Sequence, residues 1–349
     1  MVAIGLPDVV TMVGTERTQF AALVLPDQLT AETKLTDDAA HMSAIAGKTP
    51  HQWVVDAALG ASVRRVAVVS PGLSQASSEA FGRRRDDSVI HVVPPASEIA
   101  DTVANALEHI GSDFTLREAA HVVLMTTACP QVTSADIRRV LDYHLATQAA
   151  ATLCTGEIDY GSTEPVVSRD EDGRVSSIAD VPRGGGAIYC FRADVLVPAL
   201  RRCNGGSGFQ DIGTEVAAVL HEAGHHVETM DYPGRLEMVR SGASRVGVEA
   251  LLRRRVIASW IDRGVNMPDP NQVTIDATAH LGKGVTVLPG TVIEGRTVVA
   301  DGARIGPNTH LIDATIGSEA EIPHCVVQGV EIPPRQTLTP FTILPIPGG

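Results

Sequence analysis

A six-residue repeat in the last quarter of the chain is the sequence feature that most limits its fold. The repeat carries seven aliphatic residues at a strict spacing of six: Ile275, Leu281, Val287, Ile293, Val299, Ile305 and Leu311. Helices repeat every 3.6 residues and strands every 2, so neither produces this period. It is typical of a β-helix built from hexapeptides, in which each hexad forms one flat side and points its aliphatic residue inward.

The positions between the aliphatic residues support the same interpretation. Small or β-branched residues lie in phase with them: Ala279, Val285, Thr291, Thr297, Ala303 and Thr309. Glycines suited to the corners occur at Gly282, Gly290, Gly295, Gly302 and Gly306. After Leu311 the phase slips and resumes at Ile316 and Ile322. A short solenoid has poorly shielded ends, so we expect them to be covered by the first domain, by the Pro-rich tail Pro333–Pro347 or by other subunits.

Short apolar runs alternate with amphipathic stretches from about Thr18 to Asp231. The runs expected as buried strands are Ala21–Leu25, Val66–Val69, Val89–Val93, Val122–Met125 and Ala151–Thr155, and the stretches expected as helices are Pro50–Leu59, Ile99–Ile110 and Ser134–Thr147. This alternation predicts an α/β domain with a mostly parallel, doubly wound, Rossmann-like sheet covered on both faces. Ligands of such sheets bind beyond the carboxyl ends of the strands, here after Leu25, Val93 and Met125.

A single helix is expected between these two parts. Residues Ser244–Arg263 have helical spacing, with Val246, Leu251, Val256 and Ile257 expected on one side, and Gly264 and Pro268-Asp269-Pro270 end the segment. The predicted organisation is an α/β domain over residues 1–240, an arm helix and linker over 241–270, and a short left-handed parallel β-helix with a Pro-rich tail over 271–349.

Composition narrows the classes of partner and compartment. The formal net charge of −13 disfavours nucleic acid and anionic lipid as partners. The five cysteines form no C-x-x-C pair, which favours a reduced, intracellular protein. The sequence has no apolar stretch long enough to cross a bilayer and no secretion signal, so a cytoplasmic location is expected. We interpret the basic runs Arg83–Arg85 and Arg253–Arg255 as solvated surfaces.

One string matches a metal-binding motif. His221-Glu222-Ala223-Gly224-His225 fits the H-E-x-x-H pattern of zinc metalloproteases, but Gly224 weakens a helix at that point. We expect a helix Thr214–Glu222 that ends at Gly224, followed by a strand over His226–Met230, and therefore a structural role for the string. Asp170–Gly173 lies between two apolar runs, so we expect it to form a hairpin turn.

The combination of α/β domain, arm helix and β-helix resembles one family. Supporting stretches are Ala46–Lys48 with Val54–Ala57, Val123–Pro130 with Asp136, Val175–Asp180, Gly186–Phe191 and Val285–Ile312. The chain is similar to the bacterial bifunctional N-acetylglucosamine-1-phosphate uridyltransferases, which join a nucleotide-sugar pyrophosphorylase fold to a left-handed β-helix. The acetyltransferase half of that family needs more coils than follow here before Thr339-Pro340-Phe341, so acetyl transfer is not expected.

The phosphate-binding positions depart from the family's pattern. The resemblance places its glycine-rich loop, which contains an arginine, at Pro26–Thr33, where glycine is absent and Asp27 and Glu32 would repel phosphate. The arginine falls near Thr33, with Lys34 as a neighbouring substitute. The family's Pro-Lys falls on Ala39-Ala40.

The metal and sugar positions depart as well. The family's two Mg²⁺ ligands match Ala128 and Ala243, whose methyl groups cannot coordinate a cation that requires oxygen. The sugar-binding glutamate and asparagine match Asp180 and Gly185, and the base-recognition segment and the Gly-Tyr-Gly motif fall on Pro94–Ala100 and Thr163–Pro165. This leaves Asp27, Lys34, Asp180 and Gly185 as the candidates for a degenerate pocket, with neither a catalytic residue nor a metal ligand expected.

Three functions remain open. The first is a catalytically inactive scaffold or regulatory subunit linked to UDP-N-acetylglucosamine or cell-envelope precursor synthesis. It would bind an active uridyltransferase or further copies of itself, in a trimer formed through the β-helix. The second is a diverged sugar-phosphate nucleotidyltransferase, the one case that requires Mg²⁺. The third is a sugar-nucleotide sensor without turnover.

Overall fold

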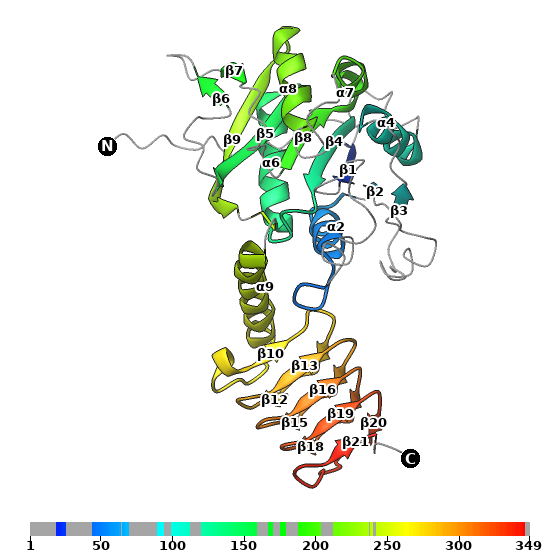
Figure 1. Ribbon diagram of the computed structural model, residues 1–349, viewed down its shortest axis with the longest axis vertical. Helices are drawn as coiled ribbons and strands as arrows, with labels where there is room; N and C mark the ends of the chain where they lie inside the picture. The colour runs from blue at the N-terminus through cyan, green and yellow to red at the C-terminus, as the bar shows by residue number, and fades with distance from the viewer. Residues whose placement is uncertain are drawn as a thin grey trace, which may run out of the picture.

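The structure is a computed structural model with an α/β domain, a single arm helix and a β-helix in line (Figure 1). It describes residues 19–25, 44–63, 65–69, 89–93, 99–111, 120–158, 167–169, 175–178, 188–203, 212–236, 238–239 and 242–345. Among the helices within these ranges, none combines the length and apolar character that a membrane-spanning helix requires.

A seven-stranded sheet forms the centre of the α/β domain. Its order is β3-β2-β1-β4-β8-β5-β9, and its strands are β1 (Gln19–Leu25), β2 (Arg65–Val69), β3 (Val89–Val93), β4 (Ala120–Thr126), β5 (Ala151–Ile158), β8 (Ile188–Arg192) and β9 (Val227–Leu236). All neighbours pair in parallel except β8, which runs antiparallel to both β4 and β5. A separate antiparallel pair joins β6 (Val167–Arg169) to β7 (Val175–Ile178), as the predicted hairpin requires.

Helices cover both faces of this sheet, which confirms the predicted fold class. One core contains side chains of α4 (Ile99–Ile110), α7 (Ala193–Leu200) and α8 (Ile212–Glu222), and the other contains side chains of α2 (Pro50–Gly60) and α6 (Ser134–Thr147). Strand β1 contributes to both, because side chains alternate along a strand. Ala21, Leu23 and Leu25 enter the first core, and Ala22 and Val24 enter the second.

Local capping explains where the helices begin. Thr49 and Thr133 precede α2 and α6, and each forms a capping box with the residue three positions later, Gln52 and Asp136. The helices expected at Pro50, Ile99 and Ser134 begin at those residues. The five expected strands are present, and Val89–Val93 has the expected bounds while the other four are longer. Local sequence was sufficient here because caps and apolar periodicity both act over a few residues.

The arm helix α9 (Gly242–Asp262) lies between the α/β domain and the β-helix (Figure 1). Gly264, just after the helix, has φ of +90°. Val265 N donates to Trp260 O at 3.0 Å, which closes the helix end as in a Schellman motif. The expected apolar side of this helix was wrong in part. Val246 and Leu251 are 68% and 43% exposed, whereas the buried residues are Val248, Leu252, Val256, Ile257 and Trp260.

The β-helix consists of three parallel sheets. After the short 3₁₀ turn Pro270–Gln272, one sheet stacks β10 (Thr274–Ile275), β13 (Val292–Glu294), β16 (His310–Ile312), β19 (Val326–Gln328) and β21 (Ile343–Leu344). The second stacks β11 (His280–Leu281), β14 (Val298–Val299), β17 (Thr315–Ile316) and β20 (Glu331–Ile332), and the third stacks β12 (Thr286–Val287), β15 (Arg304–Ile305) and β18 (Glu321–Ile322).

The hexad aliphatic residues fill the interior of the β-helix as predicted. All seven are buried, and Ile316, Ile322, Val327 and Ile332 continue the series after the phase slip. The slip is absorbed at a corner, where Asp313 adopts φ of +49° and its Oδ1 accepts the Arg296 N–H of the coil above at 2.8 Å. Strand pairing therefore stays in register, with Leu311 beside Ile293 and Val327.

The first coil is covered by the arm helix, which was not among the expected covers, and by the α/β domain, which was. Val256, Ile257 and Trp260 of the arm helix itself join the core of the β-helix, together with Val265 and Met267 of the linker. The partly buried Trp53 of the α/β domain also packs there.

A hairpin of the α/β domain completes this junction. Ile45 and Lys48 form its backbone bridge, and Ile45 packs against Val248 and Leu252 of α9. Three of its backbone carbonyls also accept hydrogen bonds from other elements. Arg245 Nη2 donates to Ala44 O at 2.7 Å, Trp53 Nε1 donates to Ile45 O at 2.8 Å, and Ala277 N donates to Ala46 O at 2.9 Å. The hairpin thus bonds to α9, α2 and the β-helix at once.

Candidate functional site

The four residues expected to line a degenerate pocket lie outside the described residues. These are Asp27, Lys34, Asp180 and Gly185. The Gly-Tyr-Gly position and residues 94–98 of the base-recognition segment lie outside as well, whereas Ile99 and Ala100 begin α4. Their placement therefore stays a prediction. The described part of the carboxyl edge includes the turn after β4, which contains Ala128, and the first turn of α9, which contains Ala243.

The turn after β4 is held by backbone contacts. Thr127 N donates to Leu25 O at 2.9 Å, which ties the turn to the end of β1, and Ala128 N donates to Thr126 Oγ1 at 3.2 Å. Ala128 is 2% exposed and belongs to the core that α2 and α6 cover. Its methyl group therefore packs among apolar atoms at the place where the family resemblance puts a metal-binding carboxylate.

The family's second metal position, Ala243, follows closely in sequence after a residue that contacts this turn. Val239 N donates to Ala128 O at 2.8 Å, and Ala243 follows four residues later in the first turn of α9, where it is exposed. The fold thus brings the turn after β4 next to the segment that leads into α9. At both matched positions the side chain is a methyl group, which does not fit Mg²⁺ because this cation requires oxygen ligands.

Asp136 is the nearest carboxylate after Ala128 in the sequence, and it is already engaged. Its Oδ2 accepts from Thr133 N at 2.9 Å, Thr133 Oγ1 at 2.6 Å and Tyr232 Oη at 3.0 Å. Burial and the nearby Asp136 carboxylate raise the pKa of Tyr232, which keeps its hydroxyl protonated as the donor. Asp136 therefore caps α6 and fixes β9 beside it.

A buried thiol lies in the same region. Burial, together with the charges of Asp136 and Asp231, raises the pKa of Cys154 to about 12. A thiol with such a pKa is neutral near pH 7 and does not act as a nucleophile or metal ligand. Four of the five cysteines are buried and all are free, as expected for thiols packed as small apolar residues.

Two arginines near this site were missed by the sequence interpretation. The run Arg253–Arg255 was expected to be a solvated surface, and this holds only for Arg254, which is exposed. Arg255 Nη2 donates to Gln131 O at 2.8 Å, across from α9 to the turn after β4. Arg253 donates to Glu249 at 2.7 Å, and its Nη1 lies 3.9 Å from Asp276 Oδ1. Burial raises the pKa of Asp276. Residue spacing alone did not show that α9 contacts the α/β domain through Arg255 and the β-helix through Arg253.

The H-E-x-x-H string does not form a zinc site of the helical type. Helix α8 ends at Glu222, and Gly224 has φ of +81°, so His225 lies beyond the helix that carries His221. The following His226 Nε2 instead lies 2.8 Å from Glu228 Oε1. Within the described ranges, three or more His, Cys, Asp or Glu side chains never converge as metal ligands would. The expected helix end is confirmed, and the strand begins one residue later than expected, at Val227.

Comparison with known proteins gives one consistent result. The chain is 26% identical over 281 residues to the bifunctional protein GlmU of Halalkalibacterium halodurans, covering 70% of this chain and 59% of the relative. It is 28% identical over 312 residues to that of a Geobacillus species (85% and 66%) and 28% identical over 315 residues to that of Bifidobacterium animalis (86% and 67%). No family model matches the chain.

The match extends through both parts of the fold but over only part of each relative. The chain spans about three fifths to two thirds of the length of these curated relatives. Sequence similarity and the two-part architecture together identify the chain as a GlmU-like protein, with a nucleotidyltransferase-like α/β domain followed by a left-handed β-helix.

Proposed function

We propose that this protein is a nucleotidyltransferase-like pseudoenzyme that acts as a scaffold or regulatory subunit, in a process linked to UDP-N-acetylglucosamine or cell-envelope precursor synthesis. The observation that carries the proposal is the pair of methyl groups at Ala128 and Ala243. The Val239–Ala128 hydrogen bond supports the match of both positions, because it joins the two segments that carry them.

The chemistry that is missing explains why turnover is not expected. Phosphoryl transfer depends mainly on positioning and on neutralising the phosphate charge with metal ions and cationic side chains. At Ala128 and Ala243 the chain has no oxygen to hold Mg²⁺, and the nearby Asp136 is occupied by three donors. The expected loss of the glycine-rich loop at Pro26–Thr33 adds to this argument.

The proposed role is to bind protein. The partner we propose is an active uridyltransferase or further copies of this chain, assembled as a trimer through the β-helix. Outward-facing apolar side chains on the β-helix support this, with Val326 and Ile343 of one face both more than a third exposed.

A direct test restores the missing ligands. In a thermal-shift titration with UTP and other nucleoside triphosphates, we expect no Mg²⁺-dependent shift for the natural chain. The variant Ala128→Asp/Ala243→Asn reinstates two oxygen ligands and is expected to gain such a shift. At a hundred times the dissociation constant, bound ligand stabilises by about 2.7 kcal/mol, which moves the melting temperature by several degrees.

The controls separate the alternatives. Each single variant should stay without a shift, because one ligand does not complete the site. Pyrophosphate release by the natural chain with UTP, N-acetylglucosamine 1-phosphate and Mg²⁺ would establish a diverged nucleotidyltransferase and refute the pseudoenzyme. A shift with UDP-N-acetylglucosamine that is independent of Mg²⁺, without turnover, would instead establish a sensor.

A further inference from the structure

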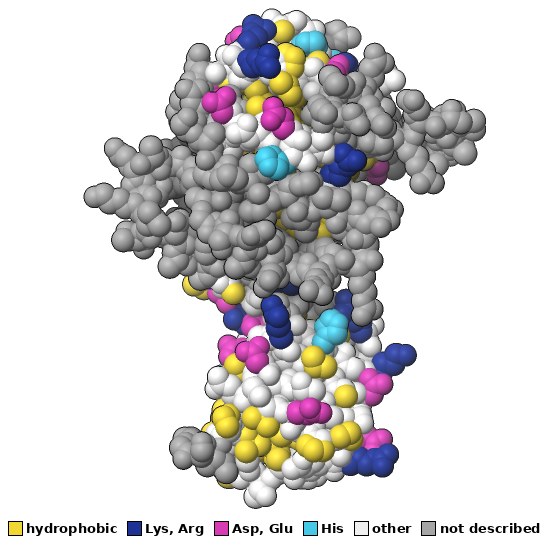
Figure 2. Space-filling model, turned by 90° about the vertical axis from the view of Figure 1, so that its right-hand side faces the viewer, with side chains coloured by type: hydrophobic (Ala, Val, Ile, Leu, Met, Phe, Trp, Pro, Cys, Tyr) yellow, Lys and Arg dark blue, Asp and Glu magenta, His cyan; other side chains and the backbone are white. Residues whose placement is uncertain are grey.

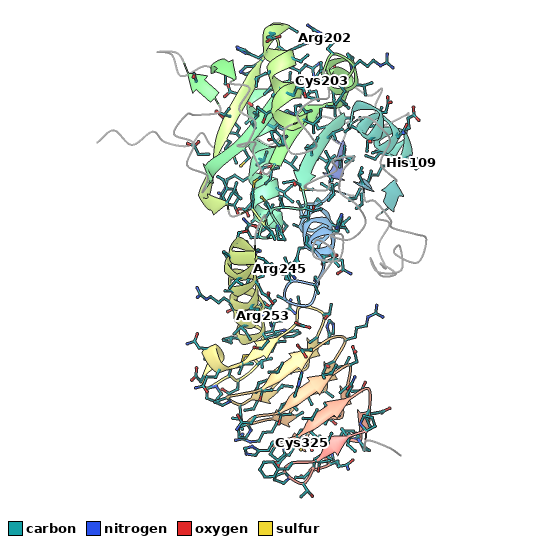
Figure 3. The ribbon with its side chains drawn as sticks, in the orientation of Figure 1. His109, Arg202, Cys203, Arg245, Arg253 and Cys325 are labelled. Carbon is teal, nitrogen blue, oxygen red and sulfur yellow. The ribbon has the colours of Figure 1, made fainter. Side chains whose placement is uncertain are left out.

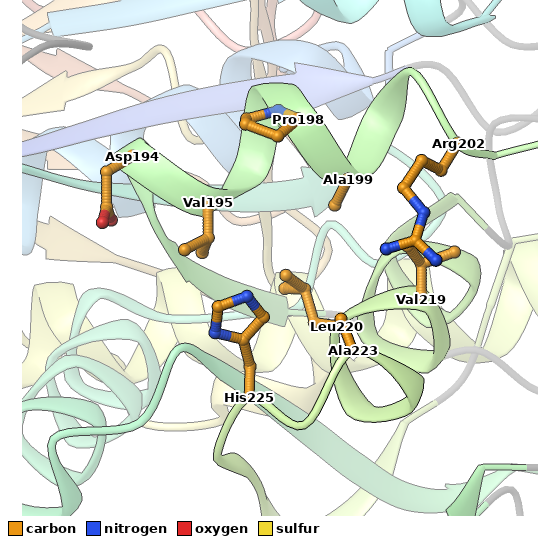
Figure 4. A pocket seen from close by; sticks show the side chains of 9 residues that line it. All are labelled: Asp194, Val195, Pro198, Ala199, Arg202, Val219, Leu220, Ala223 and His225. Carbon is orange, nitrogen blue, oxygen red and sulfur yellow. The ribbon is translucent and has the colours of Figure 1, made fainter.

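A small open pocket lies between α7 and α8, far along the sheet from the turn after β4. Its volume is about 150 Å³, and its walls are the apolar side chains of Val195, Pro198, Ala199, Val219, Leu220 and Ala223 (Figure 4). For comparison, an apolar cavity with a volume of about 150 Å³ holds a molecule such as benzene. The pocket therefore accommodates one isobutyl- or phenyl-sized group.

The pocket lies at the opposite edge of the sheet from the proposed nucleotidyltransferase-like site. Arg192, at the end of β8, pairs with His121 near the start of β4, because these strands are antiparallel. Asp194 follows directly, and His225 precedes the start of β9. These residues mark the amino edge of the parallel strands, whereas Ala128 follows the carboxyl end of β4. A ligand in this pocket would therefore bind independently of the nucleotidyltransferase-like site.

The two ends of the pocket differ in charge. Asp194 lies at one end, where Arg192 neutralises it through Nε–Oδ1 at 3.0 Å and a second contact between Nη2 and Oδ2. Arg202 lies at the other end (Figure 4). Its backbone N–H donates to Ala199 O at 2.9 Å, which fixes it just after α7. Its guanidinium is exposed and forms no ion pair with any residue that the structure describes.

Among the residues that the structure describes, the pocket therefore combines apolar walls with the unpaired guanidinium of Arg202, and His225 lines it as well. This is unusual for the surface of a chain with net charge −13. Figure 2 shows apolar side chains at the upper end of the molecule with basic side chains above them and acidic ones below. A guanidinium presents donors in a fork that matches a carboxylate, and the walls match an aliphatic or aromatic group.

We propose that this pocket binds a monocarboxylate whose apolar group is the size of a leucine side chain, with the carboxylate paired to Arg202. Two sources share this chemistry. One is a free short-chain carboxylic acid, and the other is the C-terminal residue of a peptide that ends in leucine.

The test measures binding by ligand-observed NMR with 4-methylpentanoate as the probe. Two matched ligands dissect the interaction, since 4-methylpentanamide lacks the charge and acetate lacks the apolar group. Acetylated Ala-Ala-Leu with a free C-terminus, compared with its C-terminal amide, tests the peptide source. We expect saturable binding of the acid in the millimolar range, at least tenfold tighter than that of the amide or of acetate.

Protein variants locate the site. Arg202→Gln is expected to weaken binding of 4-methylpentanoate about tenfold, and Ala223→Phe, which fills the pocket from its exposed rim, is expected to abolish it. Arg201→Gln is the matched control, because Arg201 is the neighbouring exposed arginine but does not line the pocket. Melting temperatures of all three should equal that of the natural chain.

The outcomes decide the proposal in either direction. Tighter binding of the peptide acid than of 4-methylpentanoate identifies a peptide C-terminus as the source, and the reverse identifies a small acid. Equal binding of acid and amide, unchanged binding in Arg202→Gln, or no saturable binding would overturn the proposal. The ligand comparison uses the natural chain, so it holds even where Ala223→Phe fails to fold.

Discussion

At the scale of single residues, the pair formed by the buried His144 and the partly buried His121 is the feature most sensitive to conditions. His121 Nδ1 lies 3.0 Å from His144 Nε2, and His144 Nδ1 lies 2.8 Å from Thr152 Oγ1. Burial, reinforced by Arg192, lowers the pKa of His121 to about 4. Burial, reinforced by His121 and Arg192, lowers the pKa of His144 to about 3. Both rings are therefore neutral in the folded protein at pH 7.

This pair predicts a loss of stability on acidification. The unfolded chain binds protons at both histidines near the ordinary pKa of 6.5, whereas the folded chain does so only near 4 and 3. The free energy of unfolding is therefore expected to be constant above about pH 6.5 and to fall between pH 6.5 and 4, by up to about 1.4 kcal/mol per pH unit for each histidine. Urea denaturation at pH 7, 6 and 5 measures this slope.

The matched variant is His144→Gln, which keeps a hydrogen-bonding group but does not titrate. It is expected to be less stable at pH 7, with a shallower fall toward pH 5. The same slope as in the natural chain would show that other groups cause the acid sensitivity.

At the scale of elements, the hairpin at residues 44–48 has a role that its length does not suggest. Gly47 has φ of +86°, and a Cβ atom there would lie 2.6 Å from the Cβ of Asp276 in the first coil of the β-helix. Asp276 Oδ2 in turn accepts Gly295 N at 3.1 Å from the next coil. The two domains therefore meet at a contact that only glycine permits. Figure 3 shows Arg245 and Arg253 on the arm helix beside this junction.

Gly47→Ala is expected to destabilise the protein by two separate causes. A left-handed φ costs a non-glycine residue about 1–2 kcal/mol, and displacement of Asp276 adds about 1–3 kcal/mol. Gly264→Ala is the matched control, because Gly264 has nearly the same φ of +90° and open space around it. We expect Gly47→Ala to lower the free energy of unfolding more than Gly264→Ala does.

Hydrogen exchange then localises the effect. In Gly47→Ala, the amide of Ala277, which donates to Ala46 O, is expected to lose protection, while the amides of the later coils keep theirs. Equal destabilisation by the two variants would mean that the contact with Asp276 contributes nothing.

At the scale of the whole molecule, the faces of the β-helix differ in their outward side chains. The face of β13, β16, β19 and β21 carries the outward apolar side chains Val292, Ile312, Val326 and Ile343, together with Gln328 and the ion pair of Glu294 with His310. The face of β14, β17 and β20 carries Val298 beside Thr315 and Glu331. Space-filling atoms of the apolar class gather near the lower end of the β-helix in Figure 2.

We predict that self-association uses the first of these faces. Val326→Asp places a negative charge on this face beside Ile343, and it is expected to reduce the mass measured by light scattering from three times the chain mass of 36.7 kDa toward a single copy. Val298→Asp is the matched control, since Val298 is 44% exposed and Val326 is 37% exposed. A single-chain mass for the natural protein, or equal effects of both variants, would contradict this assignment.

The sequence by itself determined the features that repeat over short distances. The six-residue period fixed the interior of the β-helix through Leu311, since each hexad buries its aliphatic residue in the same way as its neighbours. The α/β alternation and Gly264 were likewise local signals, and they predicted the covered sheet and the end of the arm helix.

Only the tertiary structure decided which segments meet. It showed that Val246 and Leu251 are exposed on α9, that Arg253 and Arg255 connect elements, and that the hairpin with Gly47 joins both domains. At the candidate site, sequence matching chose Ala128 and Ala243, but the Val239–Ala128 hydrogen bond brought their segments together. The physical reason is that periodicity specifies which side of an element is apolar, whereas contacts between distant segments depend on how whole elements pack.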